Sequence, residues 1–234
     1  MSFEPPIKNF TETVNGVSFD MVAVKGGTFS MGSESGSDNE KPIHSVTLSE
    51  FSIGKTEVTQ TLWQAVMGNN PSYFKGDNLP VESVSWNDCQ AFITKLNQLT
   101  GKNYRLPTES EWEYAARGGN QSKGYKYVGS DNIDEVAEYE GNHNKTTKPV
   151  GGKKPNELGL YDMSGNVWEW CNDWYGTFSS SAQTNPIGVP SGSLRVFRGG
   201  SLSNGAFYCR SAYRSTYYPS YSGYNLGLRL VFSR

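Results

Sequence analysis

The residue types best suited to covalent or metal chemistry are few and scattered in this sequence. The chain has three cysteines, Cys89, Cys171 and Cys209, and two histidines, His44 and His143. An odd number of cysteines cannot all pair within one chain, and no two of them have the CxxC spacing of a redox or metal site. Cys89 lies in an amphipathic helical pattern, which predicts a buried thiol. The histidines lie far apart along the chain and are both predicted to be surface residues.

The chemistry of recognition is concentrated near the C-terminus. Residues 202–225 read LSNGAFYCRSAYRSTYYPSYSGYN, with six tyrosines and no Lys, Glu, Gln, Asp, Met or Trp. Tyrosine offers a large, rigid contact at low entropic cost, and Ser, Gly and Asn add adaptable hydrogen bonds, as in antibody paratopes. The segment contains no obvious general acid or base, so its composition favours binding over catalysis. An ordinary aromatic-rich surface loop is the other interpretation of the same composition.

Two segments of different character bracket these residues. They read RVFRGGS at 195–201 and LGLRLV at 226–231. Four arginines in and between them are expected to anchor backbone carbonyls or carboxylates beneath the surface, because a guanidinium group can satisfy several acceptors: Arg198, Arg210, Arg214 and Arg229. The contrast predicts a rigid frame that carries a binding surface.

The elements that would position this segment are short. Apolar patterns predict four strands, the first two joined by a turn at a glycine pair: 19–24, 25–32, 46–48 and 51–53. A first helix is expected at about 57–67, and a second begins after Ser85, carries Leu99 inward and stops at Gly101. Thr108 and Glu111 form the capping-box pattern of a third, short helix. A long loop-like stretch follows Gly119, and the final strands are expected from residue 158 onward.

The length allows one large domain or two small ones, and because no low-complexity linker divides the chain we expect a single domain over residues 1–234, with 195–234 as its C-terminal binding segment. Only 35% of the 234 residues are hydrophobic, but six Trp, fourteen Tyr and eleven Phe can supply much of the buried area. Such a core is consistent with an irregular, loop-rich fold.

Charge and hydropathy exclude several classes of function. The formal net charge is −2 and the isoelectric point is near 5.8, so the chain has no basic stripe for nucleic acid. No apolar run approaches the roughly 20 residues that span a bilayer, and the first residues do not read as a signal peptide. The localisation stays open, with a cell surface or a virion as the expectation if a leader was removed.

Six ordered motifs cover nearly the whole chain: GGTFSMGS (26–33), KTEVTQTLWQAVM (55–67), PVESVSWNDCQAF (80–92), YRLPTESEWEYAARGG (104–119), NELGLYDMSGNVWEW (156–170) and RVFRGGS (195–201). Together they resemble the formylglycine-generating-enzyme/sulfatase-modifying-factor family. The resemblance implies a C-type lectin-like fold of the α+β class, with short strands, two to three helices and much irregular loop.

The resemblance does not imply catalysis in this chain. Active members oxidise a substrate cysteine with two cysteines of their own, which follow the GGS motif and bind copper. The comparable positions, around 204–206, hold no cysteine here, and Cys209 alone cannot provide the paired soft ligands that Cu(I) prefers. The iron-dependent sulfoxide synthases of the family use an HxxxHxE pattern, which is also absent. A copper-dependent oxidase, or a silent relative of it, stays as the alternative.

A third branch of the family fits better: the variable proteins of diversity-generating retroelements, which display a hypervariable ligand-binding face on this fold. Variation there arises at adenines, and AAC codons cannot become Lys, Glu, Gln, Met or Trp. The resemblance thus implies a non-catalytic protein, expected to be monomeric, that binds a protein or glycan ligand and requires no cofactor. Its implied ligand-binding residues are Leu202, Ser203, Asn204, Ala206, Phe207, Tyr208, Tyr213, Ser215, Thr216, Tyr217, Tyr218, Ser220, Tyr221, Ser222 and Tyr224.

Residues between these positions are expected to be fixed scaffold: Cys209, Arg210, Ser211, Ala212, Arg214 and Pro219. In the motif at 156–170, family members bind calcium through backbone carbonyls and the acidic residue that is Glu169 here, so a structural calcium ion is possible by resemblance. The alternative is that Glu169 ties down the loop through backbone N–H groups. Trp168, Trp170 and Trp174 are expected in the core rather than at a carbohydrate site.

Overall fold

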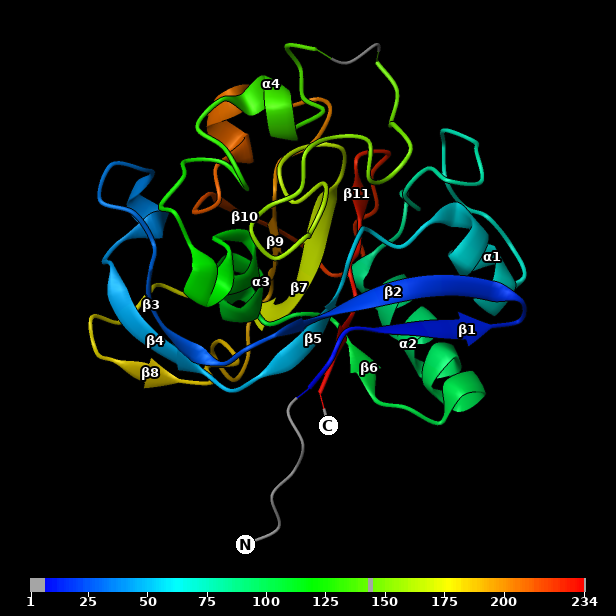
Figure 1. The fold of residues 1–234 in the computed structure, drawn as a ribbon, viewed down its shortest axis with the longest axis horizontal. Helices are drawn as coiled ribbons and strands as arrows, with labels where there is room; N and C mark the ends of the chain where they lie inside the picture. The colour runs from blue at the N-terminus through cyan, green and yellow to red at the C-terminus, as the bar shows by residue number, and fades with distance from the viewer. Residues whose placement is uncertain (1–6, 143–144, 234) are drawn as a thin grey trace, which may run out of the picture.

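The computed structural model describes residues 7–142 and 145–233, arranged as three small sheets, four α-helices and long loops. Figure 1 shows the helices flanking curled sheets, with α4 and the loops of the C-terminal segment toward the end of the molecule opposite β6. The mixed α/β architecture with much irregular loop confirms the predicted fold class.

The first sheet has five strands in the order β1-β2-β5-β12-β6. Their bounds are Phe10–Val14, Val17–Val24, Phe51–Gly54, Val231–Phe232 and Tyr104–Arg105. Strands β1 and β2 form a hairpin around Asn15 and Gly16, which both have positive φ angles of 47° and 80°. An Asn-Gly pair is the sequence signature of this tight turn, because both residues adopt positive φ at low cost. Strand β1 was not predicted.

The second sheet has the order β3-β4-β8, with bounds Gly27–Met31, His44–Leu48 and Gln183–Thr184. The strands predicted at 19–24 and 25–32 both exist, but they do not pair with each other: β2 joins β5, and β3 joins β4. Gly26 lies between them, where a Cβ atom would come within 2.6 Å of the Leu48 carbonyl oxygen. This close approach lets the chain pass from one sheet to the next.

Helices α1 and α2 each begin after a residue whose side chain caps the helix. Helix α1 spans Gln60–Met67 and begins later than predicted, because the Thr59 side chain caps it by accepting from the Leu62 amide. Helix α2 spans Trp86–Thr100, with the Ser85 cap confirmed. Leu99, predicted to face inward, is 47% exposed because it lies in the last turn of α2, beyond the core.

Helix α3, Glu109–Ala116, has the predicted capping box and is buried along its whole length. Helix α4, Ile133–Val136, is a single turn in the long irregular stretch that follows. The next strand is β7, which begins at residue 168 rather than near 158.

The third sheet has the order β10-β9-β7-β11 and carries the C-terminal segment. Its bounds are Arg214–Tyr217, Arg195–Arg198, Trp168–Trp174 and Leu226–Gly227. Trp168 and Trp170 of β7 are buried, as predicted, and both pack edge-on against Phe197. Trp174 is half-buried, and the Arg195 guanidinium lies 3.4 Å from its ring centroid. The core therefore lies directly beneath the segment with the unusual composition.

Candidate binding surface

Within residues 202–225, most positions expected to be fixed are buried and most aromatic positions expected to vary are exposed. Five of the expected scaffold residues are at most 7% exposed, and Pro219 is half-buried: Cys209, Arg210, Ser211, Ala212 and Arg214. Six aromatic residues at expected variable positions are 38–58% exposed: Phe207, Tyr208, Tyr217, Tyr218, Tyr221 and Tyr224. These six residues are called the aromatic surface below.

The remaining predicted ligand-binding residues divide into three groups. Ser220 and Ser222 are exposed, and five others are half-buried beside the aromatic surface: Ser203, Asn204, Ala206, Ser215 and Thr216. Tyr213 is half-buried and packs against Trp168 of the core, with the ring centroids 6.0 Å apart. Leu202 is only 1% exposed, contrary to the prediction, because its amide bonds to the Asn166 carbonyl and holds the residue beneath the surface.

Five of the six rings of the aromatic surface form two groups, and the ring of Tyr224 instead lies near that of Tyr73. The short 3-10 helix at Ala206–Cys209, labelled η3, presents Phe207 and Tyr208, whose rings meet edge-on at 5.8 Å. At the end of β10, Tyr217 contacts Tyr221 at 3.9 Å and Tyr218 at 5.8 Å between ring centroids. The two groups come from different parts of the C-terminal segment, η3 and the stretch from the end of β10 to Tyr221. Such rings give large contacts without many rotatable bonds.

The four predicted anchor arginines form buried ion pairs with the carboxylates of Glu40, Glu109, Glu113 and Glu169, and these eight residues are called the arginine frame below. Arg210 forms a bidentate pair with Glu40 at 2.9 and 2.6 Å. Its Nε donates to the Phe207 carbonyl, and its guanidinium lies 4.1 Å from the Phe207 ring centroid. The buried pair therefore fixes both the backbone and the ring of one exposed residue.

The centre of the frame joins β9, β10 and α3. Arg198 donates to Glu109 at 2.8 Å and to Glu113 at 2.5 Å, and Arg214 binds both oxygens of Glu109. Burial alone would raise the pKa of Glu113, but the guanidinium groups of Arg198 and Arg117 hold that pKa below its usual value. The Glu113 carboxylate stays ionised in the interior because these positive charges surround it. This confirms the predicted anchoring role of these arginines.

The fourth arginine holds the carboxylate expected to bind calcium. Arg229 binds Glu169 through contacts of 2.7–3.1 Å and also donates to the carbonyls of Gly54 and Tyr161. The indole N–H of Trp112 donates to Glu169 at 2.7 Å. Both oxygens of Glu169 therefore have side-chain partners, and neither of the partners is the backbone N–H expected from the sequence. The Arg229 guanidinium pairs with this carboxylate, so a calcium ion at Glu169 would have to compete with a buried cation.

The thiols and the described histidine are not arranged for chemistry. Cys89, Cys171 and Cys209 are all free and buried, as predicted for Cys89. Burial raises the pKa of Cys209 to about 12, so this thiol is protonated at neutral pH and unreactive. His44 is only 4% exposed and packs against Phe178 at 4.7 Å, so the prediction of a surface histidine was wrong there. His143 lies outside the described residues.

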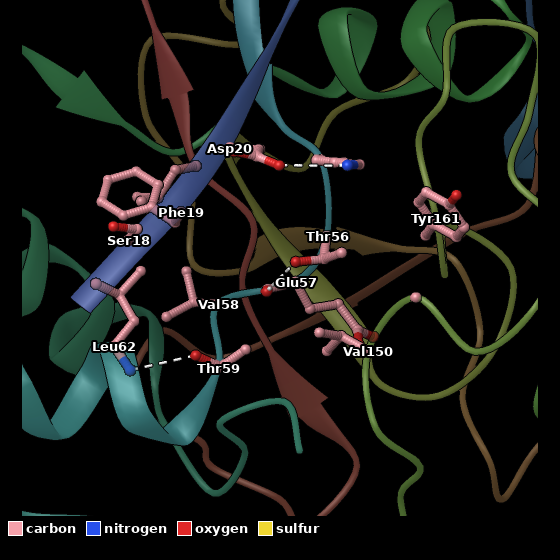
Figure 2. A pocket seen from close by; sticks show the side chains of 14 residues that line it. Ser18, Phe19, Asp20, Thr56, Glu57, Val58, Thr59, Leu62, Val150 and Tyr161 are labelled. Carbon is pink, nitrogen blue, oxygen red and sulfur yellow. Dashed lines mark hydrogen bonds and ion pairs between the residues drawn. The ribbon is translucent and has the colours of Figure 1, made fainter. Parts of the chain in front are cut away.

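A separate pocket of about 410 Å³ lies between β2 and the residues that follow β5 (Figure 2). An exposed ion pair of 3.2 Å between Asp20 and Lys55 lies at its edge. Glu57 also lines it, but the Glu57 carboxylate is engaged by the side-chain amide of Asn166 and the amide of Val167. Burial, with Asp162 and Glu169 nearby, raises the pKa of Glu57 well above its usual value. No cysteine or histidine lies in the described lining.

Sequence reasoning missed one part of the aromatic region. Tyr73, in the loop after α1, is 73% exposed, and its ring centroid lies 6.2 Å from that of Tyr224. The available signal was an aromatic pair, Tyr73 and Phe74, within a polar loop that follows Pro71.

Comparison with known proteins identifies the family. A model of the sulfatase-modifying factor enzyme 1-like domain matches residues 8–234. The chain is 39% identical to chaperone protein LppX of Paenibacillus barcinonensis, over 93% of this chain and 91% of that protein. It is 33% identical to the formylglycine-generating enzyme of Streptomyces coelicolor, over 89% of this chain and 87% of that protein.

Solved structures agree with this family. Treponema denticola variable protein 1 superposes with a TM-score of 0.92 at 34% identity, covering 98% of this chain and all of that one. PvdO from Pseudomonas aeruginosa superposes with a TM-score of 0.79 at 27% identity. Among the described residues no helix is long and apolar enough to cross a membrane. With the motifs, the fold and the matched range in agreement, the chain belongs to the sulfatase-modifying-factor, or formylglycine-generating-enzyme, family.

Proposed function

We propose that this protein is a non-catalytic member of its family that binds a ligand through the aromatic surface. The observation that carries the proposal is the agreement between exposure and expected variability. The interspersed scaffold residues are buried or half-buried, whereas six aromatic residues at expected variable positions are exposed. A surface built for changing contacts requires this separation, because a substitution at an exposed position leaves the core packing intact.

The arginine frame supports the same function. Its carboxylates come from α3, β7 and residue 40, so the frame ties the C-terminal segment to distant parts of the fold. Exposed rings on a preorganised backbone lose little entropy on binding. The protein's similarity to variable protein 1 of Treponema denticola is consistent with diversification of this segment in a retroelement system.

The coding locus tests the diversification. We expect a reverse-transcriptase gene nearby and a near-copy of codons 195–234 that differs from them only at adenines. Absence of both would point to a silent family member whose segment does not vary.

Binding itself can be tested without knowing the natural ligand. A phage library that displays a folded three-helix domain with randomised surface residues would be panned against the wild-type protein. Most selected clones should bind the Tyr217→Ala/Tyr218→Ala variant at least about tenfold more weakly than the wild type, because tyrosines contribute much of the binding energy at interfaces. Binders that do not respond to this double substitution would contradict the proposed location of the site.

An oxidase is the second candidate, favoured by the 33% identity to a formylglycine-generating enzyme. The test is to incubate the protein with Cu(I), oxygen and a cysteine-containing peptide. We expect neither stoichiometric copper binding nor oxygen consumption, because the cysteine positions after the GGS motif are unoccupied by thiols and Cys209 is buried and protonated. Turnover of the peptide would overturn the non-catalytic proposal.

A further inference from the structure

Two aromatic residues outside the C-terminal segment continue the aromatic surface. The ring of Tyr73 lies 6.2 Å from that of Tyr224, and the ring of Phe74 lies 6.1 Å from it. Tyr73 and Phe74 also meet edge-on at 5.0 Å. Three rings from two distant segments therefore form one cluster, in which Tyr73 is the most exposed member at 73%.

We propose that Tyr73 and Phe74 form, beside the variable residue Tyr224, an invariant subsite of the binding surface that contacts a protein ligand. Because the first two residues lie outside 195–234, diversification of that segment would leave them unchanged. They would supply a constant part of the affinity while the C-terminal segment supplies specificity. This inference rests on the proposed function and adds to it a site that the C-terminal segment does not contain.

The backbone that carries Tyr73 and Phe74 is held in place from below. The buried side chain of Gln60 donates to the Phe74 carbonyl at 2.8 Å and accepts from the Gly76 amide at 3.2 Å. The Phe74 amide donates to Glu82, whose side chain is also buried, at 2.8 Å. Fixing both the amide and the carbonyl of Phe74 preorders the loop, so the neighbouring Tyr73 ring is presented at low entropic cost.

The same hydrogen bonds connect this loop to the C-terminal segment. Glu82 accepts from Phe74 with one oxygen and from the Ser83 hydroxyl with the other, at 2.7 Å. The Ser83 amide donates to the Gly223 carbonyl at 2.9 Å, next to Tyr224. On the far side, the Tyr224 hydroxyl accepts from Ser203 at 3.3 Å. The subsite is therefore continuous with the predicted ligand-binding residues and is not a separate patch.

The chemistry of the cluster favours a protein over a glycan. Its ring planes are inclined by 53°, 83° and 86°, so they form edges and notches rather than a flat platform for a sugar ring. Residues 69–76 contain one charged side chain, Lys75, and residues 215–225 contain none. Protein interfaces have this character at their centres, where charged residues are depleted and Tyr and Phe are enriched.

The clones selected from the three-helix library provide the test. For most of the clones whose binding depends on Tyr217 and Tyr218, Tyr73→Ala should weaken the binding by about tenfold or more, as expected of an interface tyrosine. Tyr73→Phe should restore binding to within about threefold, because the ring and not the hydroxyl makes the contact. Ile187→Ala is the matched control: Ile187 is 70% exposed and lines a pocket with Phe51 and Phe232 that none of the aromatic-surface residues lines, so the variant should bind normally.

Three outcomes would overturn the inference, and they are distinguishable. If the clones no longer bind Tyr217→Ala/Tyr218→Ala but still bind Tyr73→Ala, the subsite is contradicted and the proposed function is not. If the clones bind both variants as well as they bind the wild type, the proposed function and the subsite are both contradicted. A glycan array on which the wild-type protein binds and Tyr73→Ala does not, together with protein clones indifferent to Tyr73, would replace the protein ligand with a carbohydrate.

Discussion

The arginines and tyrosines of the C-terminal segment alternate along one stretch of chain but lie in opposite environments. Arg198, Arg210, Arg214 and Arg229 are at most 7% exposed, and each pairs with a carboxylate, whereas the tyrosines of the aromatic surface are at least 38% exposed. A buried charge must keep its partner, while an exposed ring can be exchanged at little cost to folding. The contrast shows how one segment can combine buried ion pairs that hold the fold with exposed rings that hold little of it.

The most severe way to break the frame is Glu109→Gln. This substitution removes the carboxylate shared by Arg198 and Arg214 and leaves two buried guanidinium groups short of a partner. We expect a loss of about 3–5 kcal/mol in the free energy of unfolding, measured by urea denaturation. Glu135→Gln removes an exposed partner of Lys154 and should leave the urea midpoint unchanged. Equal effects of the two substitutions would contradict the frame.

Tyr213→Ala tests whether Tyr213 belongs to the buried core or to the exposed surface. Tyr213 lies at an expected variable position, but its half-buried ring packs against Trp168 and within 5.0 Å of Tyr208. We expect the substitution to destabilise the protein by about 2 kcal/mol, because it leaves a cavity beside the core. Thermal unfolding monitored by circular dichroism would measure this, with Tyr213→Phe as the control that keeps the ring. A negligible loss would place Tyr213 wholly on the surface.

Asp173 lies next to Glu109 of the arginine frame and forms no ion pair with an arginine among the described residues. Its contribution to the free energy of unfolding depends on pH. Burial and the nearby Glu109 raise the pKa of Asp173 to about 8. Between its usual pKa of about 4 and 8, the unfolded chain is ionised at this residue while the folded protein holds the proton, so stability falls as pH rises through that window.

Asp173→Asn cannot ionise and keeps an oxygen that can accept from the Glu109 amide, as Asp173 does at 2.9 Å. The variant should flatten this dependence by up to about 1.4 kcal/mol per pH unit and be more stable than the wild type at pH 8. Urea midpoints between pH 5 and pH 8 would measure it. Parallel profiles of the two proteins would refute the shift.

The smallest expected effect belongs to the surface itself. Tyr218 is 58% exposed, and its ring contacts only Tyr217 among the described aromatic residues. Tyr218→Ala should change the free energy of unfolding by no more than about 0.5 kcal/mol, as is usual for exposed positions. A loss comparable to that of Tyr213→Ala, measured in the same thermal scan, would show that the aromatic surface is part of the core.

Much of the fold could be predicted because its signals are local. Caps at Ser85 and Thr108 fixed two helix starts, since a hydroxyl that accepts from the helix amides needs only its near neighbours. The burial of Trp168 and the anchoring role of the arginines also follow the predictions. Errors arose where distant segments meet. His44, for example, is buried because residue 178 packs over its ring.

The amino-acid sequence by itself determined the family, the α+β class, the absence of a cysteine pair after the GGS motif, and the contrast between arginine anchors and tyrosine-rich positions. Residue type and spacing carry these features, because capping and the number of thiols do not depend on distant neighbours. Only the tertiary structure decided which carboxylate pairs with each arginine, that Leu202 lies beneath the surface, and that Tyr73 meets Tyr224. Those contacts join residues far apart in the chain, and their geometry is set by how the sheets and loops pack together.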